Sequence, residues 1–572
     1  MAPYSHTGLQ NIKKISDFAN DACNFQNLLV IQADTDEEDA DDVFRLHEPA
    51  TTPDHLKGFG LAVEVALGSG SIVFSAHHDS SVLSADRVER ILRQFETVIA
   101  ELCGQAALVH DVNMVSEADR KDIMAWNTAQ ELVDINRCAH DLIADQVQLN
   151  PSAMAIETRE TSITYGQLDD LTTDLAHRLQ AHGVGPDSLV PLCVEKSHNG
   201  VIAMLAVQKA GAAFVHIRPS DPAERLRGLV EQVDARVVIF SENTAHLNPT
   251  VAVGRNTITM PASLSAWRSP LNTEPISSLA SPDNLAYALF TSGSTGRPKA
   301  VELSHHTLSS AITGHATAMG YLPGRGQRVL QFISYTFDPC IIEIFTTLSH
   351  GGCICVPSES ERLNNLAKFV KDFRCDYAIF TPSFARGLNP DKFPTLKTLV
   401  LGGEAMTSDL AEMWGDEVHL INAYGPTETA IVCTSRTIRG PKTATEEDKR
   451  HAPENIGRPV NSYNWVLDPN DHERLVPVGC IGELAVTGPI LARGYLNEPG
   501  KTADVFKQGA RWMSEVGIDV QKVYRTGDLV RQDPADGTYM YINRKDHQTK
   551  VNGQRLELGK SSSVKRRVRK RR

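Results

Sequence analysis

The sequence has no long apolar run and no secretory leader. A membrane-spanning helix needs about 20 consecutive apolar residues, and the 572 residues contain no such stretch. The N-terminal residues Met1–His6 lack the basic and apolar segments of a signal peptide. We therefore expect a protein without a membrane partner, located in the cytoplasm.

Cysteine clusters and net positive charge are also missing. The ten cysteines are scattered, Cys353 and Cys355 form the closest pair, and no C-x-x-C motif occurs. This pattern favours reduced, mostly buried thiols over disulfides or a zinc site. The net charge of −13 argues against a nucleic-acid partner for the chain as a whole.

One segment departs from this charge balance. Residues Lys565–Arg572 read K-R-R-V-R-K-R-R. Such a run is typical either of a nuclear address or RNA-binding tail, or of a solvated chain end without a role. We favour the second interpretation and expect residues 560–572 to be a disordered basic tail.

The remaining composition is that of a globular protein with several domains. Apolar residues make up 41% and charged residues 22% of the chain. Strand-like segments such as Leu189–Val194 and Arg236–Phe240 alternate with amphipathic helical stretches. Strands that alternate with helices predict a doubly wound α/β sheet.

Residues 1–120 have a different pattern. Three segments, Phe25–Gln32, Gly60–Leu67 and Ser71–Ala76, have strand-like composition, and the apolar residues between Ala85 and Cys103 recur at helical spacing. We expect an α+β unit here, followed by a linker over residues 121–137.

The most informative stretch is Phe290–Lys299, which reads F-T-S-G-S-T-G-R-P-K between the strand-like Leu285–Phe290 and a helical run from His305. Glycines let backbone N–H groups approach an anion, hydroxyls add donors, and the lysine adds charge. The stretch therefore fits a phosphate cradle, although a flexible Ser/Gly loop has the same composition. It is not a Walker P-loop, because G-x-x-x-x-G-K-[ST] is absent.

This ten-residue string closely resembles the nucleotide loop of adenylate-forming enzymes, which include acyl-CoA synthetases, luciferases and the adenylation domains of nonribosomal peptide synthetases. Ala300 departs from the pattern, because the family has Gly after the lysine. The resemblance implies an α/β adenylate-forming core with two doubly wound subdomains and a small β-barrel subdomain. It also implies ATP and Mg²⁺ as cofactors and a phosphate cradle made of Thr291, Ser292, Gly293, Ser294, Thr295, Gly296 and Lys299, with Thr291 and Lys299 catalytic.

A second motif, Asn422–Thr429, reads N-A-Y-G-P-T-E-T. Gly-Pro forces a turn after a strand, so Tyr424 can stack on a purine, Thr427 can bind a phosphate and Glu428 can hold Mg²⁺. The matching residues of the family have these roles, with Asn422 at the adenine edge and Glu428 in catalysis. The alternative is a purely structural Asx-Pro turn.

The third motif is Tyr524–Leu529. Its Asp528 resembles the family carboxylate that binds both ribose hydroxyls. Tyr541 and Arg544 match the ribose and phosphate contacts that precede the family's hinge, where Asp546 matches the pivot.

The segment Phe337–Phe345 resembles the one that provides an aspartate for the α-ammonium group of an amino acid. A buried carboxylate is costly without a cation, so Asp338 fits a substrate counter-ion, although a solvated aspartate at a helix start has the same signature. The resemblance extends to a substrate pocket formed by Pro339, Ile342, Ile379, Leu399, Leu401, Ala423, Ile431 and Val432. This apolar lining favours an apolar or aromatic α-amino acid.

Two further residues, besides Ala300, differ from the family. His216 and Arg218 stand where the family has Pro and Asp. We expect both to be tolerated surface changes.

The resemblance covers nearly all of residues 1–559. Gly8–Ile12 and Phe25–Gln32 resemble the end of a condensation domain, but His77-His78-Asp79 does not match the catalytic H-H-x-x-x-D-G signature. The expected domains are a condensation-like fragment (1–120), the linker, an adenylation core (138–465), its β subdomain (466–546) and the start of a C-terminal lid (547–559).

After Gly559 the family continues into a lid with a catalytic lysine and then a carrier domain, and neither is matched here. We therefore expect weak unaided activity, no phosphopantetheine site in this chain, and carrier and condensation domains of a larger synthetase as partners in trans. The expected reaction is ATP-dependent activation of an amino acid as aminoacyl-AMP, with release of pyrophosphate, in nonribosomal peptide biosynthesis. A non-catalytic remnant that retains the fold and an acyl- or aryl-CoA ligase are the alternatives.

Overall fold

The computed structural model describes residue 14 and residues 27–33, 59–68, 71–104, 108–267, 271–292, 297–322, 324–510, 512–513, 522–546, 548–551 and 554–557. They belong to two compact units, Met1–Asp119 and Arg120–Arg572. The motif Gly8–Ile12, the loop residues Gly293–Gly296 and the basic tail lie outside the described residues.

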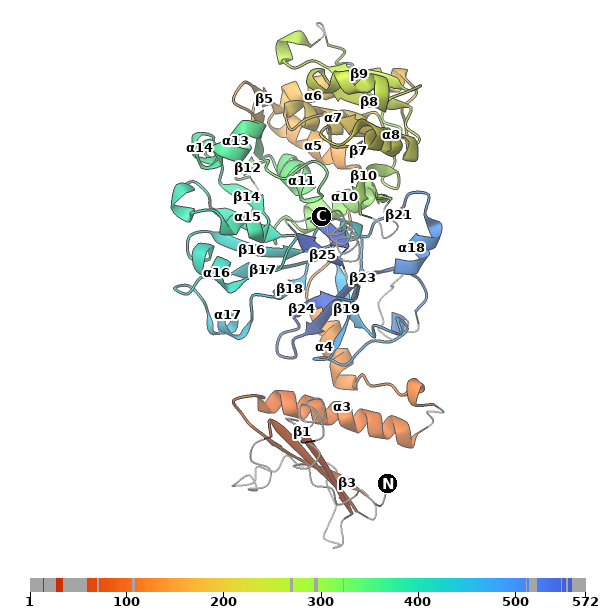
Figure 1. Ribbon diagram of the computed structural model, residues 1–572, viewed down its shortest axis with the longest axis vertical. Coiled ribbons are helices and arrows are strands. Elements are labelled where there is room, and N and C mark those ends of the chain that lie inside the picture. The colour runs from red at the N-terminus through yellow and green to blue at the C-terminus, as the bar shows by residue number, and fades with distance from the viewer. Residues whose placement is uncertain are drawn as a thin grey trace, which may run out of the picture. The chain divides into compact units, whose positions relative to one another are not determined.

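The first unit packs one long helix on a small sheet. The sheet has the order β1-β2-β3, in which β1 and β2 are parallel and β2 and β3 antiparallel. Alternate residues of β2 point to the same face, where Val63 and Val65 pack with Val88 and Phe95 of α3, which covers this face (Figure 1). The bounds are β1 Asn27–Ala33, β2 Leu61–Leu67, β3 Ile72–His78, α3 Ala85–Cys103 and η2 Val109–Asp111, which confirm the three strands and the helix predicted here.

Helix α6, Tyr165–Ala181, shows how local sequence sets an element of the second unit. The helix begins at a capping box, in which the Thr164 side chain accepts a hydrogen bond from the Gln167 backbone N–H and the Gln167 side chain accepts one from that of Thr164. It ends before Gly183, whose φ of 73° is a left-handed conformation that glycine adopts without strain. Leu171 and Leu175, four residues apart, are buried on its inner face.

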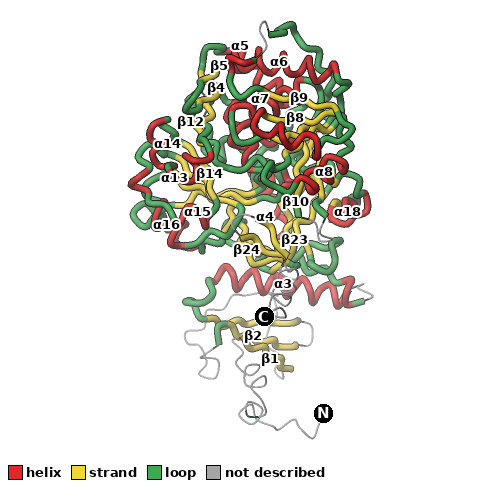
Figure 2. Tube along the Cα trace, turned by 45° about the horizontal axis from the view of Figure 1, so that its top comes forward, coloured by secondary structure: helices red, strands yellow, loops and turns green. Residues whose placement is uncertain are grey.

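A seven-stranded sheet forms the first half of this unit, with the order β21-β11-β10-β7-β6-β8-β9. Helices enclose the strands (Figure 2). Because side chains alternate along a strand, Val190 and Leu192 of β6 pack in the core that contains α6 and α7, whereas Leu189 and Cys193 pack with α8. The predicted doubly wound sheet is therefore present. Its elements are β6 Leu189–Cys193, β7 Ala213–His216, β8 Val237–Ser241, β9 Asn256–Met260, β10 Leu285–Thr291, β11 Lys299–Ser304, β21 Gly494–Tyr495, α5 Ala139–Leu149, α7 His198–Lys209, α8 Ala223–Gln232, η3 Glu242–Leu247, α9 Asn248–Val251, η4 Leu264–Ala266 and α10 His305–Gly314.

The second sheet combines parallel strands, from β4 to β16 in the sheet order, with antiparallel strands on either side of them. Its order is β19-β20-β23-β24-β18-β17-β16-β15-β14-β12-β13-β4-β5, with β22 beside β23. The α/β part contains β4 Met154–Glu157, β5 Ser162–Thr164, β12 Arg328–Leu330, β13 Cys353–Cys355, β14 Tyr377–Phe380, β15 Thr398–Gly402, β16 His419–Tyr424 and β17 Thr434–Ile438. Its helices are α11 Pro339–Ile341, the π-helix η5 Ile342–Thr346, α12 Thr347–Ser349, α13 Glu359–Asn364, α14 Leu366–Asp372, α15 Pro382–Arg386, η6 Pro390–Lys392, α16 Ser408–Trp414, η7 Thr427–Thr429 and α17 Glu446–Arg450.

The antiparallel strands join the second sheet through β17 and β18, where Thr434 pairs with Pro459. They therefore begin before residue 466, the start predicted for a β subdomain, and share one sheet with the parallel strands. Their elements are β18 Asn455–Pro459, β19 Tyr463–Leu467, β20 Ile481–Thr487, α18 Pro499–Val505, β22 Phe506–Lys507, β23 Val523–Gln532 and β24 Tyr539–Arg544, and the hairpin β25 Gln548–Val551 and β26 Gln554–Glu557 follows. The linking helix α4 is Glu117–Thr128.

The described cysteines form no disulfide, and most of them, such as Cys193 and Cys433, are buried. This confirms the expectation of buried thiols for that part of the chain. Among the described residues, no helix combines the length and the apolarity that crossing a membrane requires.

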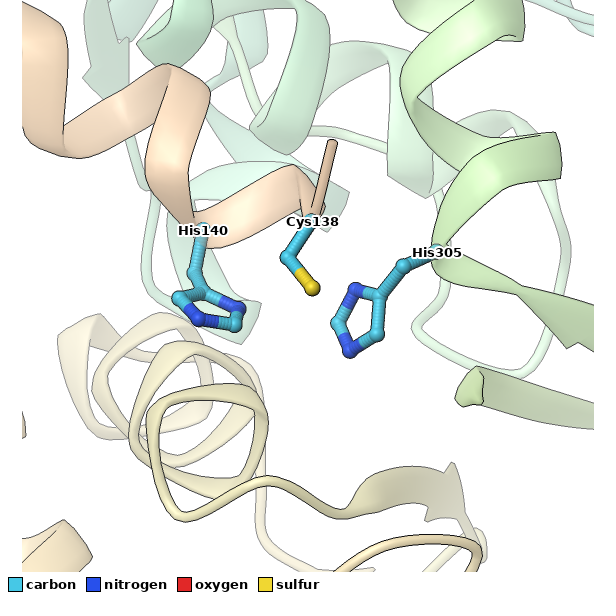
Figure 3. A group of neighbouring side chains, drawn as sticks. All are labelled: Cys138, His140 and His305. Carbon is cyan, nitrogen blue, oxygen red and sulfur yellow. The ribbon is translucent and has the colours of Figure 1, made fainter. Parts of the chain in front are cut away.

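Several histidines are enclosed in the core of the second unit. His140 and His305 face each other edge to face, with ring centroids 5.2 Å apart, beside Cys138 (Figure 3). His315 is also buried and shares a 2.9 Å hydrogen bond with Thr346. Burial lowers the pKa of His140 to about 4 and the pKa of His305 and of His315 to about 3, so all three are neutral in the folded state near pH 7.

A buried neutral histidine makes the fold sensitive to acid. Its folded-state pKa lies below the unfolded value, so its stabilising contribution is present above about pH 6.5 and is lost as the pH falls toward the folded pKa. We predict that the wild type loses about 1.4 kcal/mol more unfolding free energy than His315→Gln between pH 7.5 and 5.5. Urea unfolding at both pH values measures the difference, and equal losses for the two proteins would show that His315 is protonated in the fold.

Candidate active site

A cavity of about 1540 Å³ opens where the carboxyl ends of strands from both sheets of the second unit meet. This volume exceeds the roughly 300–1,000 Å³ of most small-molecule sites, so it can hold a nucleotide and a second small molecule. The predicted site residues on its wall are Thr291, Ser292, Asp338, Pro339, Ile342, Ile379, Asn422, Ala423, Tyr424, Thr427, Glu428, Ile431, Val432, Asp528, Tyr541 and Arg544. Four segments that are far apart in sequence therefore share one cavity. The other predicted cradle residues are Lys299, which lies behind the wall, and Gly293, Ser294, Thr295 and Gly296, which lie outside the described residues.

The prediction of Leu399 and Leu401 as pocket residues is wrong by one position. Both side chains are fully buried, and Val400 and Gly402 of the same strand line the cavity instead. Alternate residues of a strand point to opposite faces, so a shift of one residue turns every assigned side chain away from the cavity. Aromatic and apolar side chains that the sequence did not single out complete this wall, among them Met319, Phe332, Phe337, Phe380 and Phe384.

Asp338 is a buried carboxylate on the cavity wall. Its side chain does not cap the helix that follows, and the residue is only 4% exposed. The Thr427 hydroxyl donates a 2.7 Å hydrogen bond to Asp338 Oδ2. A buried carboxylate is stabilised by a nearby cation, and Asp338 lines the cavity, so its charge can attract a cationic group that enters there. The solvated helix-start interpretation of Asp338 is not supported.

Glu428 forms the centre of a second polar group. Lys299 Nζ donates to Glu428 Oε1 at 3.0 Å and to the Tyr495 hydroxyl at 2.7 Å, and that hydroxyl donates to the same Glu428 oxygen at 2.6 Å. The ammonium also lies 4.0 Å from the Tyr495 ring centroid. Sequence reasoning missed Tyr495, which lies in the short edge strand β21, where no polar pattern marks it.

Asp528 belongs to a third polar group at the cavity. The Tyr424 hydroxyl donates to Asp528 Oδ2 at 2.5 Å, and Arg544 Nη1 donates to Asp528 Oδ1 at 3.2 Å. Burial and the charge of Asp528 hold the pKa of the Tyr424 hydroxyl well above its usual value, so it stays a donor. The preceding Gly527 has a φ of 74°, and a Cβ there would lie 2.8 Å from Arg544 Nη2, so this close approach requires glycine.

Behind the apolar wall, a buried carboxylate holds the backbone in place. Glu343 accepts hydrogen bonds from the backbone N–H groups of Phe332 and Ile333 and from the Gln331 side chain. Lys196 Nζ donates to the Gln331 amide oxygen and to the Ile333 carbonyl, each at 2.7 Å. Burial raises the pKa of Glu343 to about 7, against the opposing effect of Lys196. Phe332 and Ile333 are both cavity residues, so this network positions the wall without touching the cavity.

Two residues with left-handed backbone directly follow the Asn422–Thr429 motif. Ala430 has a φ of 46° and Ile431 a φ of 87°. A β-branched residue with positive φ is a true conformational outlier and is retained where the surroundings demand it. The conformation follows the turn at η7, and the Ile431 side chain lines the cavity.

The expectation that His216 and Arg218 are both surface changes is wrong for His216. Its side chain is buried and lies against Tyr335, with ring centroids 4.8 Å apart, and burial lowers its pKa to about 3. Arg218 is exposed and lines the cavity. His216 is the last residue of β7, which lies beside β10, and Arg218 lies two residues further on. These positions account for the burial of His216 and the exposure of Arg218.

The donor types indicate which group could hold a metal ion. Mg²⁺ prefers oxygen ligands, and the Glu428 carboxylate, on the wall beside Thr427, supplies such a ligand. Cys138, His140 and His305 also lie together (Figure 3), but nitrogen and sulfur suit softer metals. In addition, the Ala139 N–H already donates to His305 Nδ1. The cavity, rather than this cluster, fits Mg²⁺.

The fold and the shared cavity define an adenylate-forming protein. Residues 143–496 match the AMP-binding enzyme family, and the chain belongs to that family. The chain contains an adenylation domain, and nearly the whole of the chain is homologous to fungal nonribosomal peptide synthetases.

Two such relatives illustrate the similarity. The nonribosomal peptide synthetase TES of Alternaria alternata is 40% identical over 98% of this chain and 11% of its own length. The N-benzoylphenylalaninol synthetase apmA of Penicillium brevicompactum is 40% identical over 98% of this chain and 23% of its own length. The chain thus spans between about a tenth and a quarter of these relatives.

Solved structures show the same fold. The nonribosomal peptide synthetase FmoA3 in its AMPPNP-bound form matches with a TM-score of 0.74 at 22% identity, covering 94% of this chain and 57% of its own. Its α-methyl-L-serine-AMP-bound form matches with a TM-score of 0.72, also at 22% identity, covering 90% of this chain and 58% of its own.

Removal of the Lys299 ammonium is expected to destabilise the fold. The Glu428 side chain is 1% exposed, and a buried charge that loses its partner costs about 3 kcal/mol or more. We predict this loss of unfolding free energy for Lys299→Met, measured by urea denaturation. Lys449→Met, which breaks an exposed pair with Glu446, is the control and should change stability by about 0.5 kcal/mol at most. Equal effects of the two variants would contradict the role given to Lys299.

Proposed function

We propose that this chain activates an amino acid by adenylation, as one step of nonribosomal peptide biosynthesis. The amino-acid carboxylate attacks the α-phosphorus of ATP, and the bond to the β-phosphate oxygen breaks, giving aminoacyl-AMP and pyrophosphate. The observation that carries the proposal is the shared cavity, which has the buried Asp338 carboxylate at one place and the phosphate-loop residues Thr291 and Ser292 at another. Carrier and condensation domains of a larger synthetase are the proposed partners.

The side chains of the cavity divide the work as the family resemblance suggests. Asp338 binds the α-ammonium group and so orients the carboxylate toward the nucleotide. Tyr424 stacks on the adenine, whose edge Asn422 contacts, while Asp528 and Tyr541 bind the ribose hydroxyls. Lys299 donates a hydrogen bond to Glu428. With Mg²⁺ bound, Glu428 would supply a carboxylate ligand, and the Lys299 ammonium would be able to donate to a phosphate instead. Thr291, Ser292, Thr427 and Arg544 supply further donors to the phosphates.

The substrate is proposed to be an apolar or aromatic amino acid. The wall that Asp338 shares also contains Ile342, Ile379, Val400 and Phe332, which offer apolar surface to a side chain. The name of the relative apmA refers to a phenylalaninol product, which agrees with an aromatic substrate. Amino-acid-dependent exchange of pyrophosphate into ATP, with a panel of apolar, aromatic and charged amino acids, tests this assignment.

The panel also separates the rival functions. Exchange with benzoate or a fatty acid, but with no amino acid, would favour an acyl- or aryl-CoA ligase. Absence of heat in titrations with Mg·ATP and with apolar amino acids would favour a non-catalytic remnant.

Asp338→Ala should abolish amino-acid-dependent exchange. Loss of one partner of a buried charge pair costs at least about 2–5 kcal/mol, so we expect a fall of about 100-fold in kcat/KM for the amino acid. Asp409→Ala, which removes an exposed partner of Arg386, is the control and should retain full exchange. An unchanged rate in Asp338→Ala would refute the role of Asp338 as the substrate counter-ion.

Glu428→Gln should specifically raise the Mg²⁺ requirement. A neutral amide is a much weaker ligand of Mg²⁺ than a carboxylate, so the Mg²⁺ concentration for half-maximal exchange is expected to rise about tenfold or more. Titration of Mg²⁺ at fixed ATP measures this concentration. The same half-maximal concentration in wild type and variant would show that the metal is held elsewhere.

A further inference from the structure

The arginines on the cavity wall differ in whether they form an ion pair with a carboxylate. Among the described residues, four arginines line the wall, and three of them form ion pairs: Arg225 with Asp221 at 3.3 Å, Arg362 with Glu359 at 2.6 Å, and Arg544 with Asp528 and Asp546 at 3.2 and 2.7 Å. For the fourth, Arg218, the described residues provide no carboxylate within ion-pair distance. Its Nη2 donates to the Thr336 hydroxyl at 3.2 Å.

The sheet brings this arginine to the same cavity as the start of the phosphate loop. Strands β7 and β10 are parallel neighbours, with Phe214 opposite Tyr287 and Val215 opposite Ala288. Arg218 lies two residues beyond the end of β7, and Thr291 is the last residue of β10. Both residues line the cavity at the carboxyl ends of these two neighbouring strands.

The hydrogen bond to Thr336 places the Arg218 side chain beside the segment that leads to Asp338. Thr336 precedes Asp338 by two residues in the same connecting segment. Arg218 is therefore located between the strand that leads into the phosphate loop and the segment that carries the buried Asp338. It is at least one-third exposed and lines the cavity, so its guanidinium is accessible to a ligand that enters there.

The cavity needs such a cation if it binds a polyphosphate. Its described wall contains the acidic side chains Asp221, Asp338, Glu404, Glu428, Glu454, Asp528 and Asp546. Three of its four arginines are already paired with carboxylates, and Lys299 is held by Glu428. An arginine without a carboxylate partner is the group whose charge a phosphate chain can use in full, and its planar fork matches two phosphate oxygens.

We propose that Arg218 forms a polyphosphate subsite that binds the β- and γ-phosphates of ATP and the pyrophosphate product. The inference rests on the proposed function in placing the nucleotide in this cavity. Arg218 stands where the resembling family has an aspartate, so the subsite is particular to this chain. A carboxylate at that position would repel the phosphate chain, whereas the guanidinium attracts it.

The test compares ligands with and without the outer phosphates. Isothermal titration of Arg218→Ala with Mg·ATP, with pyrophosphate and with AMP is expected to show about tenfold weaker binding of the first two and unchanged binding of AMP. Arg218→Asp should weaken ATP and pyrophosphate binding further, and Arg218→Lys should restore part of it. Arg225→Ala is the matched control, because Arg225 lines the same cavity but is paired with Asp221, and it should bind all three ligands as the wild type does.

The outcomes separate this inference from the proposed function. Equal ATP and pyrophosphate affinities in Arg218→Ala and wild type would overturn the inference and leave amino-acid activation intact. A proportional loss for AMP, or a loss confined to the amino acid, would also overturn it. A wild type that binds ATP but exchanges no pyrophosphate would refute the proposed function, while the ATP-to-AMP comparison would still decide the role of Arg218. A wild type that binds none of the three ligands would overturn both.

Discussion

The interaction on which the site depends is the contact of Glu428 with Lys299 and Tyr495. Lys299 begins β11 and Tyr495 ends β21, and both strands belong to the first sheet of the second unit. Glu428 follows β16 of the second sheet, and its carbonyl also accepts a 2.8 Å hydrogen bond from the Ala492 N–H. A nearly fully buried carboxylate cannot remain charged without such partners. The contact therefore ties the two sheets together at the cavity.

In the proposed function the Glu428 carboxylate both pairs with Lys299 and binds Mg²⁺, and these two uses compete. An acidic wall attracts Mg²⁺ but repels phosphates, so each negative side chain has to be compensated when the nucleotide binds. Asp528 is held by Arg544 and by the Tyr424 hydroxyl, and Glu428 by Lys299. Asp338 accepts a hydrogen bond from the Thr427 hydroxyl, and its buried carboxylate lines the cavity.

The apolar wall of the cavity is held in position by side chains that do not themselves line the cavity. Glu343 and Lys196 fix the backbone of Phe332 and Ile333 from behind. The strained backbone at Ile431 places one further apolar side chain on the wall. Buried polar networks of this kind are costly unless each member is satisfied, and this one fixes the backbone of two residues that line the cavity.

The sequence alone predicted much of the fold and most of the cavity residues, because these depend on local patterns. The period of apolar residues gave α3 and the strands β2 and β10 within a residue or two, and compact motifs marked Asp338, Tyr424, Glu428 and Asp528. The sequence did not show which face of the strand at Leu399 and Leu401 points into the cavity. Successive side chains of a strand point to opposite faces, so an error of one residue in the alignment to the motif reverses the direction of every side chain.

Only the tertiary structure decided which distant groups meet. The pairing of Lys299 with Tyr495, the burial of His216 and the presence of Arg218 and Thr291 on one cavity wall depend on sheet order and register between segments that are remote in the chain. Local composition carries no information on these contacts, because they arise from how the sheets pack rather than from any short pattern. The sequence by itself determined the chemistry available to this protein, and the packing of its two sheets decided which of those groups face one another.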